Sequence, residues 1–132
     1  MKILVVDDDA PTRLVLRRLL GQQLRCEVVD AANGMVALDL VNREAPDLVL
    51  LDLQMPGMDG IEVLHTLRTW RHTQQLPVIV LTSETDESVV RRCLAKGVSG
   101  YLAKPLQPSH VAERIRRLLP PDAQGEPERQ AS

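Results

Sequence analysis

Acidic residues follow two short apolar runs of the sequence, in positions that could bring three carboxylates together. Asp7 and Asp8 come directly after residues 3–6, and Asp52 comes directly after residues 48–51. Unbroken apolar runs of this length are typical of parallel strands that are buried on both faces. Because the carboxyl ends of parallel strands lie at the same edge of a sheet, we expect the three carboxylates to lie close together.

Carboxylates at such short range repel one another, and a bound cation is the simplest way to relieve the repulsion. The ligands on offer are oxygen atoms, without cysteine or histidine beside them. Such ligands favour Mg²⁺, a cation that shares its coordination shell with water and phosphate. Asp52 alone also has a simpler interpretation, because aspartates that end strands often only cap the following loop.

Two further predicted strands end in side chains that suit a phosphoryl group. Residues 78–81 lead into Thr82, and residues 100–103 lead into Lys104 and Pro105. A metal ion and an ammonium group neutralise phosphoryl oxygens, a hydroxyl donates a hydrogen bond to them, and a carboxylate can attack phosphorus. The whole set, more than any one of its members, predicts a site that holds a phosphoryl group.

The elements that must position these residues alternate along the chain. The expected helices span residues 10–21, 34 to just before Pro46, 60 to about 70, after 86 to 97, and 108–119. Asp9 and Asn33 are the predicted N-caps of the first two helices, and Gly21 is expected to end the first. Alternating strand and helix units of this kind predict an α/β protein with a doubly wound parallel sheet.

The faces of two helices can be predicted from the spacing of their apolar residues. In the first helix four apolar residues are expected to face the core and three arginines the solvent. The apolar residues are Val15, Leu16, Leu19 and Leu20, and the arginines are Arg13, Arg17 and Arg18. In the fourth helix the apolar residues at helical spacing are Val89, Val90, Cys93 and Leu94.

Composition limits the class of protein. A length of 132 residues with 44% hydrophobic content suits one domain with a full core, and no apolar stretch is long enough to span a membrane. No signal-peptide pattern precedes the first strand, so a cytoplasmic protein is expected. A net charge of -2 gives no reason to expect direct binding to nucleic acid. Cys26, placed in a strand, and Cys93, in a helix, are predicted to be reduced structural thiols.

Four segments resemble the signatures of the receiver domain of two-component response regulators, the CheY-like family. They are residues 2–8 (KILVVDD), 52–60 (DLQMPGMDG), 77–83 (PVIVLTS) and 97–105 (GVSGYLAKP), in the order and spacing of that family. The resemblance covers roughly the first nine-tenths of the chain. It implies a flavodoxin-like fold, with a five-stranded parallel sheet in the order 2-1-3-4-5 and five helices.

The resemblance also implies a role for each residue of the site. Asp52 would be the phosphoacceptor, and Thr82 and Lys104 would contact the phosphoryl group. The ligands of Mg²⁺ would be Asp7, Asp8, Asp52 and the backbone carbonyl of Gln54. Tyr101 would be the switch aromatic, paired with the hydroxyl of Thr82, and the peptide bond before Pro105 would be cis.

The implied partners follow from these roles. The phosphoryl donor would be a phosphohistidine of a sensor histidine kinase or phosphotransfer protein. Phosphorylation would draw Thr82 and Lys104 inward and let Tyr101 turn from exposed to buried, which changes the surface of helix four, strand five and helix five. That surface would bind a downstream protein, control a C-terminal output domain or form a homodimer. The only reactions that such a domain catalyses are its own phosphorylation and dephosphorylation.

The basic residues on this surface have a second interpretation as ordinary solvated side chains. They are Arg91, Arg92 and Lys96 on helix four and Arg114, Arg116 and Arg117 on helix five.

Residues 120–132 differ in composition from the rest of the chain. They contain proline, glycine, glutamine and glutamate, with alanine as the only apolar type. Such a segment cannot bury a face, so it is predicted to be a flexible tail or linker after a receiver domain over residues 1–119. The chain could be a natural stand-alone regulator or a receiver domain cut from a longer protein.

Four positions depart from the common pattern of the family. Gln54 and Glu84 occupy positions that influence the access of water to the phosphate, so the lifetime of the phosphorylated state is open. Ser83 replaces a frequent alanine, and Leu106 replaces a frequent phenylalanine. Neither Ser83 nor Leu106 removes a catalytic group.

Three other classes fit the sequence less well. A haloacid-dehalogenase-like phosphatase also uses a strand-end aspartate as nucleophile, but it would need a second acid where this chain has Gln54. A pseudo-receiver, which keeps the fold for binding alone, would not need the intact set of site residues. A dinucleotide-binding domain would need a glycine-rich first turn, which is absent.

Overall fold

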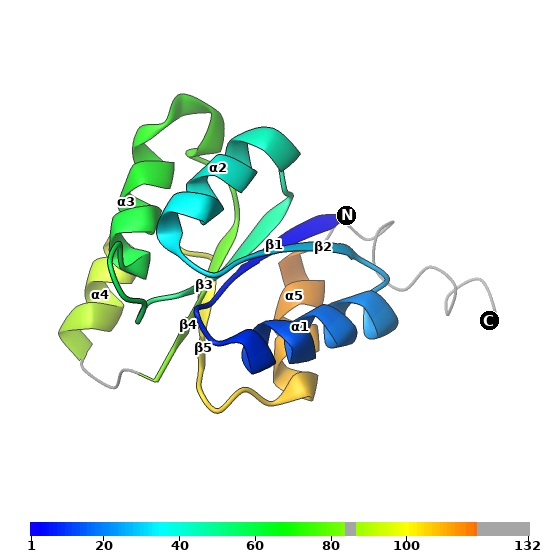
Figure 1. Ribbon diagram of the computed structural model, residues 1–132. Helices are drawn as coiled ribbons and strands as arrows, with labels where there is room; N and C mark the ends of the chain where they lie inside the picture. Colours follow the sequence, from blue (N-terminus) through cyan, green and yellow to red (C-terminus); the bar gives the residue numbers. More distant parts are fainter. Residues whose placement is uncertain (84–86, 119–132) are drawn as a thin grey trace.

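The computed structural model describes residues 1–83 and 87–118 of the chain. Within these residues five strands and five helices alternate, as predicted (Figure 1). The strands are β1 (Lys2–Val6), β2 (Glu27–Ala31), β3 (Leu48–Asp52), β4 (Val78–Thr82) and β5 (Gly100–Ala103). The helices are α1 (Ala10–Gln23), α2 (Gly34–Glu44), α3 (Gly60–Thr69), α4 (Glu87–Ala95) and α5 (Pro108–Leu118), with the 3-10 turn η1 (Arg71–Thr73) after α3.

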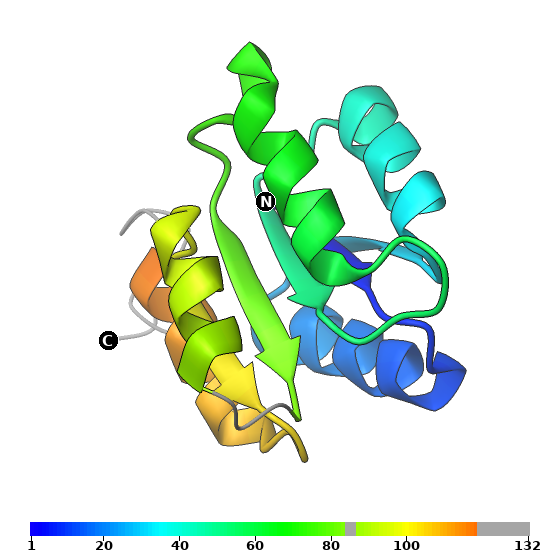
Figure 2. The same cartoon turned by 90° about the vertical axis from the view of Figure 1, so that its left-hand side faces the viewer.

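The five strands form one parallel sheet in the order β2-β1-β3-β4-β5. Helices α1 and α5 cover one face of the sheet, and α2, α3 and α4 cover the other (Figures 1 and 2). This is the doubly wound, flavodoxin-like fold that the sequence predicts, so the predicted strand order is confirmed.

The register of the strands determines which residues meet at the carboxyl edge of the sheet. Val6 of β1 pairs with Leu51 of β3, and Asp52 pairs with Leu81 of β4. Thr82 pairs with Ala103, the residue before Lys104. The chain segments that leave β1, β3, β4 and β5 therefore emerge side by side.

The core consists of one apolar layer on each face of the sheet. Every residue of β3 and β4 is buried, which explains why these strands are continuous apolar runs in the sequence. Leu16 and Ile115 belong to the layer under α1 and α5, and Leu64 and Leu67 belong to the layer on the opposite face. The chain contains no phenylalanine, so aliphatic side chains make up most of both layers.

Side-chain caps begin the first three helices. Asp9 accepts a hydrogen bond from the backbone N–H of Thr12 at 3.1 Å, and Asn33 accepts one from Val36 at 2.9 Å. Both predicted N-caps are confirmed. Asp59 and Glu62 form a capping box at the start of α3, which fixes the end of the loop that follows β3.

The predicted end of α1 and the predicted burial of Val15 are wrong. The helix continues past Gly21 to Gln23, because glycine in place of alanine inside a helix costs only about 1 kcal/mol of stability. The backbone leaves the helical conformation after Gln23 and adopts a positive φ of 55° at Arg25. Val15 is 56% exposed. The buried stripe of α1 is centred on Leu16, Leu19 and Leu20, and Val15 lies at its margin.

The apolar residues of α4 are less buried than their spacing suggests. Cys93 is buried, whereas Leu94 is 55% exposed because adjacent helical residues point about 100° apart. Cys26 lies just before β2, not within it. Cys26 and Cys93 are buried free thiols, and burial raises the pKa of each.

Arg68 of α3 ties three segments together at the end of the molecule away from the strand tips. Its guanidinium donates hydrogen bonds to the backbone carbonyls of Thr73, Leu76, Lys96 and Gly97 at 2.8–3.1 Å. Burial lowers the pKa of this guanidinium. Arg68 thus anchors the carboxyl end of α4 to α3.

The remaining predictions concern membrane spans and the boundary of the domain. Among the described residues, no helix has the length and apolar content needed to cross a membrane. The predicted boundary between domain and tail, at residues 119 and 120, lies outside the described residues, as does Glu84.

Candidate functional site

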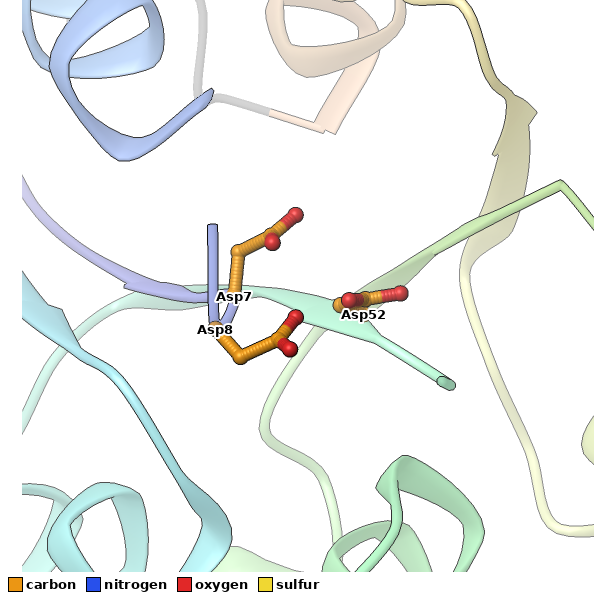
Figure 3. Close-up of side chains that lie close together, drawn as sticks. All are labelled: Asp7, Asp8 and Asp52. Carbon is orange, nitrogen blue, oxygen red and sulfur yellow. The ribbon is translucent and has the colours of Figure 1, made fainter. Parts of the chain in front are cut away.

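The carboxylates of Asp7, Asp8 and Asp52 meet at the carboxyl edge of the sheet. One oxygen from each lies within 4.8 Å of the others (Figure 3). Asp7 and Asp8 come from the chain that leaves β1, and Asp52 is the last residue of β3. Asp7 is 0% exposed and Asp52 is 1% exposed, whereas Asp8 is open to solvent.

The ammonium group of Lys104 places a positive charge beside the carboxylates of Asp7 and Asp52. Its Nζ lies 2.9 Å from Oδ2 of Asp7 and 3.4 Å from Oδ2 of Asp52. The peptide bond between Lys104 and Pro105 is cis. Burial lowers the pKa of Lys104, but the hydrogen bond to Asp7 and the charges of both aspartates outweigh that effect and raise the pKa above its ordinary value. The side chain is therefore a permanent ammonium beside two buried carboxylates.

Backbone N–H groups hold the two buried carboxylates in place. Oδ1 of Asp7 accepts a hydrogen bond from the N–H of Asp9 at 2.9 Å, and Oδ1 of Asp52 accepts one from Gln54 at 3.1 Å. Burial raises the pKa of Asp52, and the charge of Asp7 adds to the rise, while the Gln54 N–H and Lys104 oppose it. The carboxylate of Asp52 is thus fixed in orientation, and its ionised form is disfavoured by burial and by the charge of Asp7.

The charges and ligand types of the site fit a divalent cation. With Asp7, Asp8 and Asp52 ionised and Lys104 protonated, the site carries a net charge of about -2, and the carboxylate oxygens lie close enough to share one ion. Oxygen ligands with a partly open side, given by the exposed Asp8, suit Mg²⁺ and its retained waters. The carboxylates of Asp7, Asp8 and Asp52 are the residues that could hold the ion.

Thr82 and Tyr101 come from the neighbouring strands β4 and β5. Thr82 is 1% exposed at the end of β4, and Tyr101 in β5 is 45% exposed. Both line a small apolar hollow with Cys93 of α4. A buried threonine and a half-exposed aromatic residue therefore share one hollow.

Two polar residues link the loops that follow β3 and β4. The hydroxyl of Ser83 donates a hydrogen bond to Oε1 of Gln54 at 2.5 Å. The side-chain amide of Gln54 is thus engaged with a neighbour, while its backbone N–H contacts Asp52.

Gly60 supports the site in a way that the sequence analysis did not anticipate. A Cβ added there would lie 2.2 Å from the backbone oxygen of Asp52 and 2.6 Å from Cα of Leu53. The N–H of Gly60 also donates to the carbonyl of Leu53 at 3.1 Å. The first turn of α3 therefore packs directly on the backbone that carries Asp52. The only signal in the sequence was the glycine itself, at the start of a helix.

Arg13 was predicted to face the solvent, and this is wrong. Its Nη1 donates to the backbone carbonyl of Asp7 at 2.8 Å, and its Nε donates to Oδ2 of Asp30 at 3.2 Å. Leu16 and Leu20 follow Arg13 at i+3 and i+7, so Arg13 lies at the margin of the buried stripe, and its long side chain reaches back to the end of β1.

Two of the three histidines lie away from the strand tips. His65 contacts Lys96, and His72 contacts Asn42 and stacks on Trp70. His110 is exposed in the first turn of α5 and lines a hollow with Lys104 and Pro105. A hollow between α3 and α4 also lies elsewhere, with Met58, His65 and Lys96 among its lining residues.

Comparisons with known proteins agree with this geometry. A family model described as the response regulator receiver domain matches residues 3–116. The chain is 34% identical over 119 residues to sporulation initiation phosphotransferase F of Bacillus subtilis, covering 90% of this chain and 94% of that protein. It is 41% identical over 121 residues to the DNA-binding response regulator MtrA of Mycobacterium tuberculosis, covering 89% of this chain and 50% of that protein.

A solved structure gives the same result for the fold. The chemotaxis protein CheY4 of Vibrio cholerae superposes with a TM-score of 0.83 and 31% identity, covering 89% of this chain and 98% of that one. The chain thus spans nearly all of two of these relatives and about half of the third. With a family match over most of its length and the strand tips arranged as described, the chain belongs to the receiver domain family of two-component response regulators.

Proposed function

We propose that this receiver domain accepts a phosphoryl group on Asp52 from a phosphohistidine of a sensor histidine kinase or phosphotransfer protein. The observation that carries the proposal is the convergence of Asp7, Asp8 and Asp52 within 4.8 Å, with the ammonium of Lys104 against two of them. A buried carboxylate that is fixed in orientation, beside cationic groups, is suited to attack phosphorus.

The reaction would be a direct transfer. An oxygen of Asp52 forms a bond to phosphorus as the phosphorus–nitrogen bond of the donor breaks, and the donor imidazole leaves with the electron pair. Asp7, Asp8, Asp52 and the backbone carbonyl of Gln54 would hold Mg²⁺, which when bound neutralises phosphoryl oxygens. The Gln54 N–H keeps Asp52 oriented for the attack.

Lys104 and Thr82 would contact the transferred group. The ammonium of Lys104 already lies 3.4 Å from Oδ2 of Asp52, so a phosphoryl group on that side chain would come within its reach. Thr82 ends the adjacent strand and would donate its hydroxyl hydrogen to a phosphoryl oxygen. Hydrolysis of the acyl phosphate by water would return the domain to its first state.

A phosphatase that acts on other molecules is the second candidate, and the site argues against it. Such an enzyme would need an acid or base two residues after its nucleophile. That position holds Gln54, an amide whose oxygen accepts a hydrogen bond from Ser83. Neither side chain is a proton donor or acceptor of suitable strength for acid–base catalysis.

The proposal is tested with acetyl phosphate as a small phosphoryl donor. We expect the intact mass of the protein to increase by one phosphoryl group in the presence of Mg²⁺, and the added group to be released by mild base, as an acyl phosphate is. Chelation of the metal with EDTA should reduce incorporation at least tenfold, because the carboxylate cluster then lacks the cation that balances it.

Other outcomes of the same experiment point elsewhere. Steady release of inorganic phosphate without a protein adduct would favour the phosphatase. No reaction with or without Mg²⁺ would favour a receiver that acts by binding alone.

We further propose that phosphorylation changes the surface formed by α4, β5 and α5. Movement of Thr82 toward the phosphoryl group would enlarge the hollow that it shares with Tyr101. The half-exposed ring could then turn inward, which would favour one of two states of that surface. The occupant of the surface would be a downstream protein, an output domain joined through residues 120–132, or a second copy of the chain.

Tyr101 is the only tyrosine, so its exposure can be measured directly. In a Trp70→Phe background, which removes the only tryptophan, we expect acrylamide to quench tyrosine fluorescence at least twofold less after treatment with acetyl phosphate and Mg²⁺. The Asp52→Asn variant in the same background is the control and should show no change. Equal quenching before and after phosphorylation would contradict the movement of Tyr101.

A further inference from the structure

Arg13 of α1 connects the acidic cluster to the edge strand β2. Its Nη1 donates to the backbone carbonyl of Asp7 at 2.8 Å, and its Nε donates to Oδ2 of Asp30 at 3.2 Å. The side chain is only 20% exposed, and that of Asp30 is 31% exposed. The guanidinium therefore lies between β2 and the chain that leaves β1.

Asp30 is itself held by a second arginine. Nη2 of Arg17 lies 3.0 Å from Oδ1 of Asp30, and Nη1 of Arg17 donates to the carbonyl of Val28 at 3.0 Å. The residue after Asp30 also takes part, because the carbonyl of Ala31 accepts the N–H of Asp7 at 3.1 Å. Strand β2 thus holds the N–H of Asp7 directly and its carbonyl through Arg13.

The carbonyl of Asp7 belongs to the peptide bond that leads into Asp8. Its orientation therefore determines the direction in which Asp8 projects from the chain. Asp8 is exposed, and among the described residues no side chain or backbone group hydrogen-bonds to its carboxylate. By contrast, Asp7 and Asp52 each have a backbone N–H and Lys104 to orient them. The position of Asp8 thus depends on the backbone that Arg13 holds.

We propose that Arg13, fixed by Asp30, is a positioning residue that holds Asp8 in the geometry needed to bind a divalent cation. It does not touch the ion or the phosphoryl group. The proposal rests on the metal site of the proposed function, and it adds Arg13 and Asp30, which are not ligands of that site. Groups that orient metal ligands in this way commonly change metal affinity by about 10- to 100-fold when they are removed.

The test is the affinity of the unphosphorylated protein for Mg²⁺, measured by NMR titration of backbone amide signals. We expect Arg13→Ala to weaken Mg²⁺ binding by about tenfold. The amide signal of Asp8 should also shift in the absence of metal. Arg13→Lys should not restore the affinity, because one ammonium cannot reproduce the fork that spans the Asp7 carbonyl and Asp30.

Arg18→Ala is the matched control. Arg18 is an exposed arginine of the same helix that takes no part in the contacts among Asp7, Arg13 and Asp30, so Mg²⁺ affinity should change less than twofold. If Arg13→Ala does not fold, Asp30→Asn serves in its place. That variant keeps the shape of the side chain, weakens the anchor of Arg13, and should lower Mg²⁺ affinity several-fold.

The outcomes separate this proposal from the proposed function. Wild-type binding with equal affinities in the Arg13 and Arg18 variants would overturn the positioning role and leave the metal site intact. Full rescue by Arg13→Lys would overturn it too, because charge alone would then suffice. Absence of Mg²⁺ binding by the wild type would instead contradict the metal site, and with it the role of Arg13.

Discussion

Replacing Asp52 by asparagine is expected to abolish phosphate incorporation and, without metal, to raise the melting temperature of the protein. The first effect follows because an amide oxygen is a poor nucleophile and cannot form the acyl phosphate. The second follows from the cost of the native charge. Burial and the neighbouring Asp7 raise the pKa of Asp52, so the ionised carboxylate destabilises the fold at neutral pH.

One contact opposes this gain in stability. Lys104 would lose an ionised partner 3.4 Å away, but it keeps the shorter contact to Asp7 at 2.9 Å. Asparagine has nearly the same shape as aspartate and retains the oxygen that accepts the Gln54 N–H. Relief of charge repulsion is therefore expected to exceed the loss of the longer contact.

Mg²⁺ should reverse the order of stability. A ligand present at 100 times its Kd stabilises the folded state by about 2.7 kcal/mol, and this gain requires the intact carboxylate cluster. We expect the wild type to gain that stabilisation and Asp52→Asn to gain much less. Thermal unfolding in EDTA and in MgCl₂, together with intact mass after acetyl phosphate treatment, measures both effects.

Asp39→Asn is the matched control. Asp39 is an exposed aspartate of α2 that pairs with Arg43 at 2.8 Å, so its loss should leave both incorporation and Mg²⁺ stabilisation unchanged. Incorporation that persists in Asp52→Asn would mean that another residue is the acceptor. A fall in melting temperature in EDTA would mean that the contact to Lys104 outweighs the repulsion.

The strand tips could be predicted from the sequence because two physical rules apply there directly. Strands buried on both faces must be continuous apolar runs, so β1, β3 and β4 are visible without any structure. Parallel strands end at one edge, so the residues after each run must converge. The grouping of Asp7, Asp8, Asp52 and Lys104 follows from these rules, and the structure places these side chains together.

Contacts that depend on distances between elements could not be predicted in the same way. Arg13 was assigned to the solvent because it is charged, although its spacing from Leu16 and Leu20 places it at the buried face of α1, where a long side chain can reach the end of β1. The four carbonyls that Arg68 contacts belong to two separate segments, residues 73–76 and 96–97, and neither segment is marked in the sequence. Nothing in the sequence distinguishes the surroundings of Gly21 from those of Gly60. The structure shows that a Cβ added at Gly21 would have no atom within 4 Å, whereas one added at Gly60 would meet the backbone of Asp52.

Replacing Gly60 by alanine is expected to destabilise the fold strongly, although alanine favours a helix over glycine by about 1 kcal/mol. The added Cβ would lie 2.2 Å from the backbone oxygen of Asp52 and 2.6 Å from Cα of Leu53, closer than any real Cβ contact. Both neighbours are backbone at the end of β3, so neither can turn aside as a side chain could. The strand end or the first turn of α3 must move.

Such overpacking against backbone should exceed the helix preference and lower the free energy of unfolding by about 3 kcal/mol. Because the displaced backbone carries Asp52, we also expect weaker Mg²⁺ binding and less phosphate incorporation. Gly21→Ala is the matched control, since nothing lies within 4 Å of the added Cβ in α1. There the helix preference acts alone and should stabilise the protein by about 0.5–1 kcal/mol.

Urea unfolding followed by Trp70 fluorescence measures both variants on one scale. Opposite signs for the two glycines would show that close packing of α3 on β3, and not helix propensity, determines the residue at position 60. Equal stabilisation would mean that the end of β3 yields to the methyl group, and that Asp52 needs no such support from α3.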